Sequence, residues 1–151
     1  MRINILGRPT KKVSKKQLEQ AGRWFCKKLF DSSTLRRLKL QVKLNINDPY
    51  LFGESYYDNP KTCNYRYDIS LNRHLGDKRM VATLAHELVH VKQYVYGEYV
   101  KFTRADKEHL IKWCGKYIDH QTTPYWEYPW EIEACGLEVC LYHQYCEEVE
   151  H

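Results

Sequence analysis

The sequence predicts a single α+β domain over residues 1–151, with a short mixed or antiparallel sheet and packed helices. A chain of 151 residues suits one domain with a core of its own. Apolar residues alternate strictly in two segments, which is typical of half-buried strands. In other segments they recur at steps of three and four residues, which indicates helices. No internal repeat or low-complexity segment divides the chain.

One strand and one helix are expected at the start of the chain. Residues 2–6 alternate in polarity and predict a short strand. A helix is expected to begin at Ser14, where Gln17 completes a capping box, and to end near Phe30.

Two clear strands are expected in the middle of the chain. They cover residues 38–46 and 65–71, in which every second residue is apolar. Between them, residues 50–63 are rich in Gly, Asn, Asp and Tyr and predict a loop or hairpin.

A long helix is expected over residues 78–96, which contain neither Gly nor Pro. Asp77 is placed to cap its first turn, and Gly97 stands where a C-cap glycine would end it. The expected buried stripe consists of Met80, Leu84, Leu88 and Val91.

The most informative motif, His86-Glu87-Leu88-Val89-His90, falls in the middle of this helix. Two histidines four residues apart lie on one helix face and can bind one zinc ion, leaving room for a water ligand. Glu87 can reach that water and act as the general base. The alternative is a helix whose histidines are hydrogen-bonded within the fold. The strand at residues 65–71, just before this helix, is the candidate edge for an extended substrate, with an ordinary internal strand as the alternative.

The last third of the chain is expected to hold two more helices. The best stretch of the first is Ala105–Trp113, followed by a loop at residues 121–128. The second is expected from Pro129 to about Glu148. Its expected inward-facing residues are Ile132, Leu137, Cys140 and Leu141.

A catalytic zinc site needs a third protein ligand, and Glu131 is the preferred candidate. The small Ala134 on the same helix face would let this helix approach the motif helix closely. Glu133 is an alternative on another face, and acidic residues in a first helical turn are also common without a metal. The remaining alternatives are the histidines His109, His120 and His143.

Hydrolysis also needs a donor that stabilises the developing oxyanion. Tyr125 and Tyr128, in the loop before the last helix, are the candidates, with His120 as an alternative.

Composition sets further expectations. Residues 1–50 hold 13 Lys and Arg against 3 Asp and Glu, so they could contact nucleic acid, although a solvated helix face is the preferred interpretation. The chain shows neither a secretory h-region nor a long apolar run, so we expect an intracellular protein without a membrane span. The six cysteines are accordingly expected to be free thiols.

The motif helix, the strand before it and the later block Pro129-Trp130-Glu131-Ile132-Glu133-Ala134 together resemble the small SprT-like zinc metallopeptidases, including forms carried by phages and other viruses. The glutamate followed by a small residue also resembles thermolysin-type gluzincins. The resemblance covers roughly residues 65–145 and implies a zincin-like fold, with His86 and His90 as zinc ligands, Glu87 as the general base and Glu131 as the third ligand.

The sequence departs from both families at two points. SprT-type proteases of DNA repair use a third histidine after the motif, and no such continuation follows His90. Gluzincins carry an acid four residues after the glutamate ligand, where this chain has Cys135. The partner that would orient a zinc histidine is therefore unassigned.

The expected function is a zinc-dependent metallopeptidase that acts on a peptide or protein substrate. The alternatives are a non-catalytic zincin-like scaffold and a nucleic-acid-binding module that uses the basic first half. The oligomeric state is not indicated by the sequence.

Overall fold

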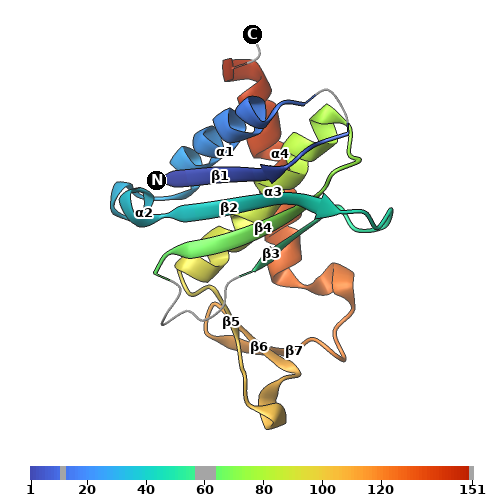
Figure 1. The fold of residues 1–151 in the computed structure, drawn as a ribbon. Coiled ribbons are helices and arrows are strands. Elements are labelled where there is room, and N and C mark those ends of the chain that lie inside the picture. Colours follow the sequence, from blue (N-terminus) through green and yellow to red (C-terminus); the bar gives the residue numbers. More distant parts are fainter. Residues whose placement is uncertain (11–12, 57–63, 150–151) are drawn as a thin grey trace.

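The computed structural model describes residues 1–10, 13–56 and 64–149 (Figure 1). It contains both helices and sheets, which confirms the α+β class. In chain order the elements are β1 (Arg2–Gly7), α1 (Lys15–Leu29), α2 (Ser32–Arg37), β2 (Lys39–Ile46), β3 (Gly53–Tyr56), β4 (Arg66–Asn72), α3 (Asp77–Val95), β5 (Tyr99–Lys101), a 3₁₀ turn (Ala105–Lys107), β6 (Leu110–Trp113), β7 (Lys116–Asp119), a second 3₁₀ turn (Tyr125–Glu127) and α4 (Pro129–Val149).

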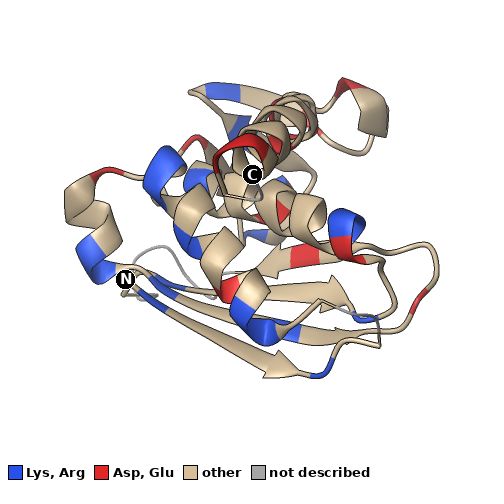
Figure 2. Ribbon diagram, turned by 90° about the horizontal axis from the view of Figure 1, so that it is seen from above, with Lys and Arg blue, Asp and Glu red and all other residues tan. Residues whose placement is uncertain are grey.

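The main sheet has the strand order β1-β2-β4-β3. Strands β1, β2 and β4 are parallel, and β3 is antiparallel to β4. Helices α1 and α3 cover one face of the sheet, and α4 packs against α3 (Figures 1 and 2). The alternation predicted for β2 explains this layering, because Leu40, Val42 and Leu44 are buried beneath the helices.

The edge of the sheet beside α3 is β3, so the expectation that residues 65–71 form this edge is wrong. Strand β4 is an interior strand, with β2 on one side and β3 on the other. The segment before β3 is held against the end of β4 by Asn72. The side-chain amide of Asn72 donates to the carbonyls of Asp48 (2.7 Å) and Leu51 (2.9 Å). The predicted loop or hairpin at 50–63 thus contributes a strand, and its residues 57–63 lie outside the described residues.

The ends of the two central helices are only partly as predicted. The Ser14–Gln17 capping box of α1 is confirmed. Gly97 is also confirmed as the glycine that ends α3, at φ +66°, and Glu98 N donates to Gln93 O (2.9 Å) as in a Schellman motif. The N-cap of α3 is Gly76, however, so the prediction for Asp77 is wrong. Its carboxylate instead accepts from Val13 N (3.1 Å), which ties the start of α3 to the segment before α1.

Strands β5, β6 and β7 form a second, antiparallel sheet. The helix expected at Ala105–Trp113 is therefore wrong, because a 3₁₀ turn and β6 occupy that segment. Cys114 (φ +45°) and Gly115 (φ +87°) make the tight turn from β6 to β7. Two successive residues with positive φ form a turn whose backbone twist matches that of the two strands it joins. A continuing helix could not accommodate these φ angles.

Helix α4 begins at Pro129 as predicted, but its buried face differs from the expected one. Trp130, Ala134, Leu141 and Tyr145 are buried, whereas Ile132 is 58% exposed. Cys140 is likewise exposed, so the inward orientation expected for it and for Ile132 is wrong.

The described cysteines are free thiols, as predicted, and Cys63 lies outside the described residues. Within the described part of the chain, no helix combines the length and the apolar character needed to cross a membrane.

Candidate metal centre

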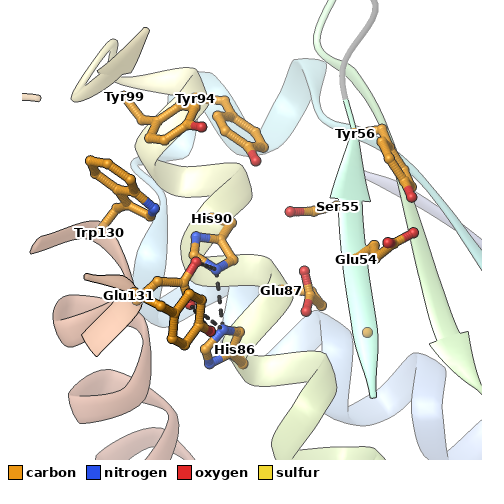
Figure 3. A pocket seen from close by; sticks show the side chains of 12 residues that line it. Glu54, Ser55, Tyr56, His86, Glu87, His90, Tyr94, Tyr99, Trp130 and Glu131 are labelled. Atoms are coloured by element: carbon orange, nitrogen blue, oxygen red, sulfur yellow. Dashed lines mark hydrogen bonds and ion pairs between the residues drawn. The ribbon is translucent and has the colours of Figure 1, made fainter. Parts of the chain in front are cut away.

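Helix α3 carries the two histidines and the glutamate of the motif in its middle turns. It spans 19 residues, so the motif is far from either frayed end and the four-residue spacing places both imidazoles on one face. His90 is buried and His86 is partly exposed, and both line one cavity (Figure 3).

The first turn of α4 brings Glu131 to the same point. Ala134, one turn further along, is fully buried and lets α4 approach α3 closely. The structure thereby brings together the ligand set preferred from the sequence, namely His86, His90 and Glu131.

The distances within this cluster fit a tetrahedral ion. The two Nε2 atoms lie 3.1 Å apart. The Glu131 carboxylate oxygens lie 3.4 Å from each Nε2, Oε2 facing His86 and Oε1 facing His90. Ligands bound at 2.0–2.1 Å in a tetrahedron are separated by about 3.3 Å, so one zinc-sized ion fits between the three groups. The fourth corner of the tetrahedron would face the cavity.

The other nitrogen of each imidazole is held by a second residue. Nδ1 of His86 lies 3.1 Å from the Glu138 carboxylate, and Nδ1 of His90 lies 2.8 Å from Gln93 Oε1. Both partners accept, so both Nδ1 atoms donate. In the neutral imidazoles this leaves the lone pairs on the two Nε2 atoms that face each other, as metal ligation requires.

The orientation of the Gln93 amide follows from its own contacts. Its Nε2 donates to Trp130 O (2.9 Å) and to the Glu133 carboxylate (2.9 Å), so Oε1 must be the atom that faces His90. The side chain is fully buried. Glu133, the alternative ligand, also forms an ion pair with Lys92 (2.9 Å). Its carboxylate is therefore bound to Lys92 and Gln93 rather than directed at the histidines.

The histidines and Glu131 shift one another's pKa values. Burial disfavours the imidazolium of His86, but hydrogen bonds to Glu131 and Glu138 outweigh it and raise the pKa of His86 to about 10. The same opposition between burial and Glu131 leaves the pKa of His90 raised. Burial also acts to raise the pKa of Glu131, yet the two histidines hold that pKa well below its ordinary value. Without an ion, the cluster therefore holds protons that a metal must displace.

Glu87 lies across the cavity from Glu131 and next to β3 (Figure 3). Only 4% of it is exposed, and burial raises the pKa of its carboxyl group against the opposing effect of the nearby histidines. Ser55 of β3 hydrogen-bonds to it. Gly53 allows this approach, because a Cβ atom there would lie 2.7 Å from Glu87 Oε1.

Of the two tyrosines predicted to assist, the structure brings only one to the cluster. The Tyr125 hydroxyl donates to Glu131 Oε2 (3.0 Å), and burial together with the Glu131 charge raises the pKa of Tyr125. The Tyr128 hydroxyl instead donates to the carbonyl of His120 (2.5 Å), while its ring stacks on Trp130. The Tyr128 hydroxyl is thus bonded within the loop and is not brought to the cluster, and a catalytic role for Tyr128 stays a prediction.

The cavity in front of the cluster has a volume of about 290 Å³. Its walls come from β3, α3, the first turn of α4 and the start of β5, and they include Ser55, Glu87, Tyr94, Tyr99 and Trp130. Polar groups make up most of its surface.

The other histidines weighed as ligands lie elsewhere. His120 Nε2 bonds to the carbonyl of Glu108 (2.9 Å), and His109 accepts from His120 N through its backbone. His143 contacts the ring of Tyr142 near the end of α4. None of the three belongs to the cluster that the described residues form.

Sequence reasoning missed Glu138 and Gln93. Glu138 lies seven residues, or two helical turns, after Glu131 and therefore on the same helix face. Because Cys135 stands where gluzincins have an acid, this next acid on the face could have been predicted to orient a histidine. Gln93 lies three residues after His90 on the same face, a spacing that also permits contact. Ser55 had no such signal, because its placement depends on the pairing of β3 with β4.

No family model, curated protein or solved structure matches this chain. The resemblance to SprT-like peptidases thus stays a prediction, and the geometry of the cluster carries the functional argument.

The basic residues of the first 50 positions are spread over β1, α1, α2, β2 and the segments between them. Some have acidic partners, namely Arg23 with Glu19, Lys28 with Glu148 and Lys43 with Asp68. These pairs reduce the charge that could meet a phosphate backbone. Nucleic-acid contact through this half stays a prediction.

Proposed function

We propose that this protein is a zinc-dependent peptidase whose ion is held by His86, His90 and Glu131. The single observation that carries the proposal is the convergence of two Nε2 atoms, 3.1 Å apart, on the Glu131 carboxylate, which faces each of them with one oxygen at 3.4 Å, beside a buried glutamate. Two imidazoles and one carboxylate are a ligand set typical of catalytic zinc sites. When bound there, zinc would polarise the scissile carbonyl and acidify a coordinated water.

The residues of the chain have distinct tasks in this proposal. Glu87 accepts the proton of the attacking water and passes it to the leaving amine, and its raised pKa brings it closer to the working pH of such a proton carrier. Tyr125 gives up its hydrogen bond to Glu131 when substrate enters and donates to the developing oxyanion instead. Glu138 and Gln93 hold the imidazoles in the binding tautomer.

The substrate class follows from β3. This strand ends the sheet beside Glu87 in the described part of the chain, and the backbone groups on its outer side suit pairing with an extended peptide. An extended chain along β3 would cross the cavity in front of the cluster.

The test compares zinc-loaded wild type with Glu87→Gln on a denatured protein substrate, with zinc content measured for both. We expect equal zinc content and a rate reduced by roughly 100- to 10,000-fold, because the proton acceptor is lost while the ligands remain. Glu147→Gln makes the same change at an exposed position on α4 and should leave the rate unchanged. Equal rates for wild type and Glu87→Gln would refute the mechanism, and bound zinc with no hydrolysis by wild type would favour the non-catalytic scaffold.

A further inference from the structure

A second cavity adjoins the candidate metal centre. It has a volume of about 410 Å³ and shares Tyr99, Tyr125, Trp130 and Glu131 with the first cavity. Figure 3 shows Tyr99 and Trp130 on one side of the histidine pair and β3 on the other. We call this second cavity the aromatic pocket, and its apolar walls are Tyr99, Phe102, Ile111, Tyr128 and Trp130.

The walls of the aromatic pocket are fixed by their own packing. Tyr128 stacks on Trp130 with ring centroids 4.6 Å apart, and Tyr99 meets Trp130 edge-on at 5.2 Å. Tyr99, Ile111 and Trp130 are buried and form a small core beneath the β5–β6–β7 sheet. The pocket is therefore preformed, and binding there would require little reordering of its walls.

The polar groups of the pocket largely satisfy one another. The Tyr125 and Tyr128 hydroxyls donate to Glu131 and to the His120 carbonyl, so they present ring faces rather than free donors. The formal charges of Lys101 and Glu108 cancel, and the charge of Glu131 faces the histidine pair. With no excess of either sign, the pocket suits an apolar side chain better than a charged one.

We propose that the aromatic pocket binds an aromatic side chain of the peptide substrate and thereby selects the bond that is cut. This inference rests on the proposed function. Aromatic rings are favoured over aliphatic chains because the stacked and edge-on walls offer both ring faces and ring edges. A peptide extended along β3 would face Tyr99 and Trp130 across the first cavity, and one of its side chains would reach past this shared wall into the pocket.

The first experiment uses zinc-loaded wild type and peptides that are identical except at one position, which holds Phe, Leu, Ala, Lys or Asp. We expect kcat/KM for the Phe peptide to exceed that for the Ala peptide by about 10- to 100-fold, the effect of burying one large apolar side chain. Moving the Phe by one residue should move the cleaved bond by one residue, as mapped by mass spectrometry. Cleavage at bonds unrelated to the Phe would overturn the proposal.

The second experiment changes the charge of the pocket with Lys101→Glu. This variant leaves Glu108 without its compensating cation, so the ratio of kcat/KM for the Lys peptide to that for the Phe peptide should rise at least about 10-fold. Lys116→Glu makes the same change on the exposed side of β7, outside the pocket, and should leave the ratio unchanged. An equal ratio in all three proteins would contradict the pocket assignment.

A third measurement separates this inference from the proposed function. The isoleucine methyl signals of metal-free protein are followed by NMR while N-acetyl-phenylalanine amide or N-acetyl-lysine amide is added. Ile111 lines the aromatic pocket but not the first cavity, so we expect the Phe probe to shift the Ile111 signal, with Ile69 on β4 as the unaffected reference. An Ile111 shift in a protein that hydrolyses no peptide would refute the peptidase and retain the pocket, whereas hydrolysis without any Ile111 shift would do the reverse.

Discussion

The two sides of the candidate metal centre hold their histidines by different chemistry. On one side, His86 donates to the carboxylate of Glu138 at the mouth of the cavity. On the other, the buried His90 donates to the neutral amide of Gln93, which is itself fixed by two acceptors. A charged partner raises the basicity of its imidazole, whereas a buried amide contributes orientation at a smaller cost in desolvation. The comparison shows that one cluster can combine an imidazole made more basic by a charged partner with an imidazole held rigidly by a neutral one.

The largest effect should come from removing the ligand that both sides share. Glu131→Gln takes away the charge that faces both Nε2 atoms. We expect zinc affinity to fall by more than the 10- to 100-fold that is typical when an outer hydrogen-bonding partner is lost. Competition with a chromogenic chelator measures this. Glu133→Gln, the rival candidate, should change affinity little, and the opposite ranking of the two variants would displace Glu131 as the ligand.

The next largest effect is expected on the buried side. Gln93→Leu removes the acceptor for His90 Nδ1 and the amide group that donates to the Trp130 carbonyl and to Glu133. We expect zinc affinity to fall about 10- to 100-fold and the free energy of unfolding to fall by about 1–3 kcal/mol. Chelator competition and urea unfolding give the two values. Gln144→Leu, exposed on α4, is the control and should alter neither.

A smaller effect is expected on the exposed side. Glu138→Gln keeps an oxygen that can accept from His86 Nδ1 but removes its charge, so zinc affinity should fall by about 10-fold. Glu138→Ala removes the acceptor as well and should cost more. Equal affinities for Glu138→Gln and Glu138→Ala would mean that charge alone matters on this side, and wild-type affinity in both would mean that Glu138 does not support the metal site.

The smallest effect is a pH dependence of the metal-free protein. The pKa of His86 is raised from 6.5 to about 10, so its contribution to stability is complete below about pH 6.5 and is lost as the pH rises towards 10. We expect the melting temperature of chelator-treated wild type to fall over this range more than that of His86→Ala, with His143→Ala behaving like wild type. Zinc affinity should rise with pH over the same range, because the ion competes with protons. An equal fall of the melting temperature with pH in wild type and His86→Ala would contradict the raised pKa of His86.

The parts of the site fixed by helical spacing could be predicted from the sequence. His86, Glu87 and His90 needed only the geometry of one helix, and Glu131 needed only an acid in the first turn of a helix beginning at Pro129. The contribution of β3 could not be predicted. It depends on pairing with β4 and on the close approach of Gly53 to α3, both of which are contacts between distant parts of the chain.

The β5–β6–β7 sheet was missed for a different reason. Its strands are only three or four residues long, too short for alternation to be distinguished from a helical pattern. The turn at Cys114-Gly115 lacks the Asn-Gly or Asp-Gly pair that usually marks a two-residue hairpin. The aromatic pocket, which this sheet helps to form, was therefore also beyond sequence reasoning.

The division of the ligands between α3 and α4 bears on how the protein is made. While the ribosome is still adding residues 100–130, the emerging chain carries both imidazoles but lacks the carboxylate and Glu138. Assembly of the three-residue cluster has to wait for α4 to dock on α3. The order of translation thus keeps the cluster incomplete until the last helix has been made.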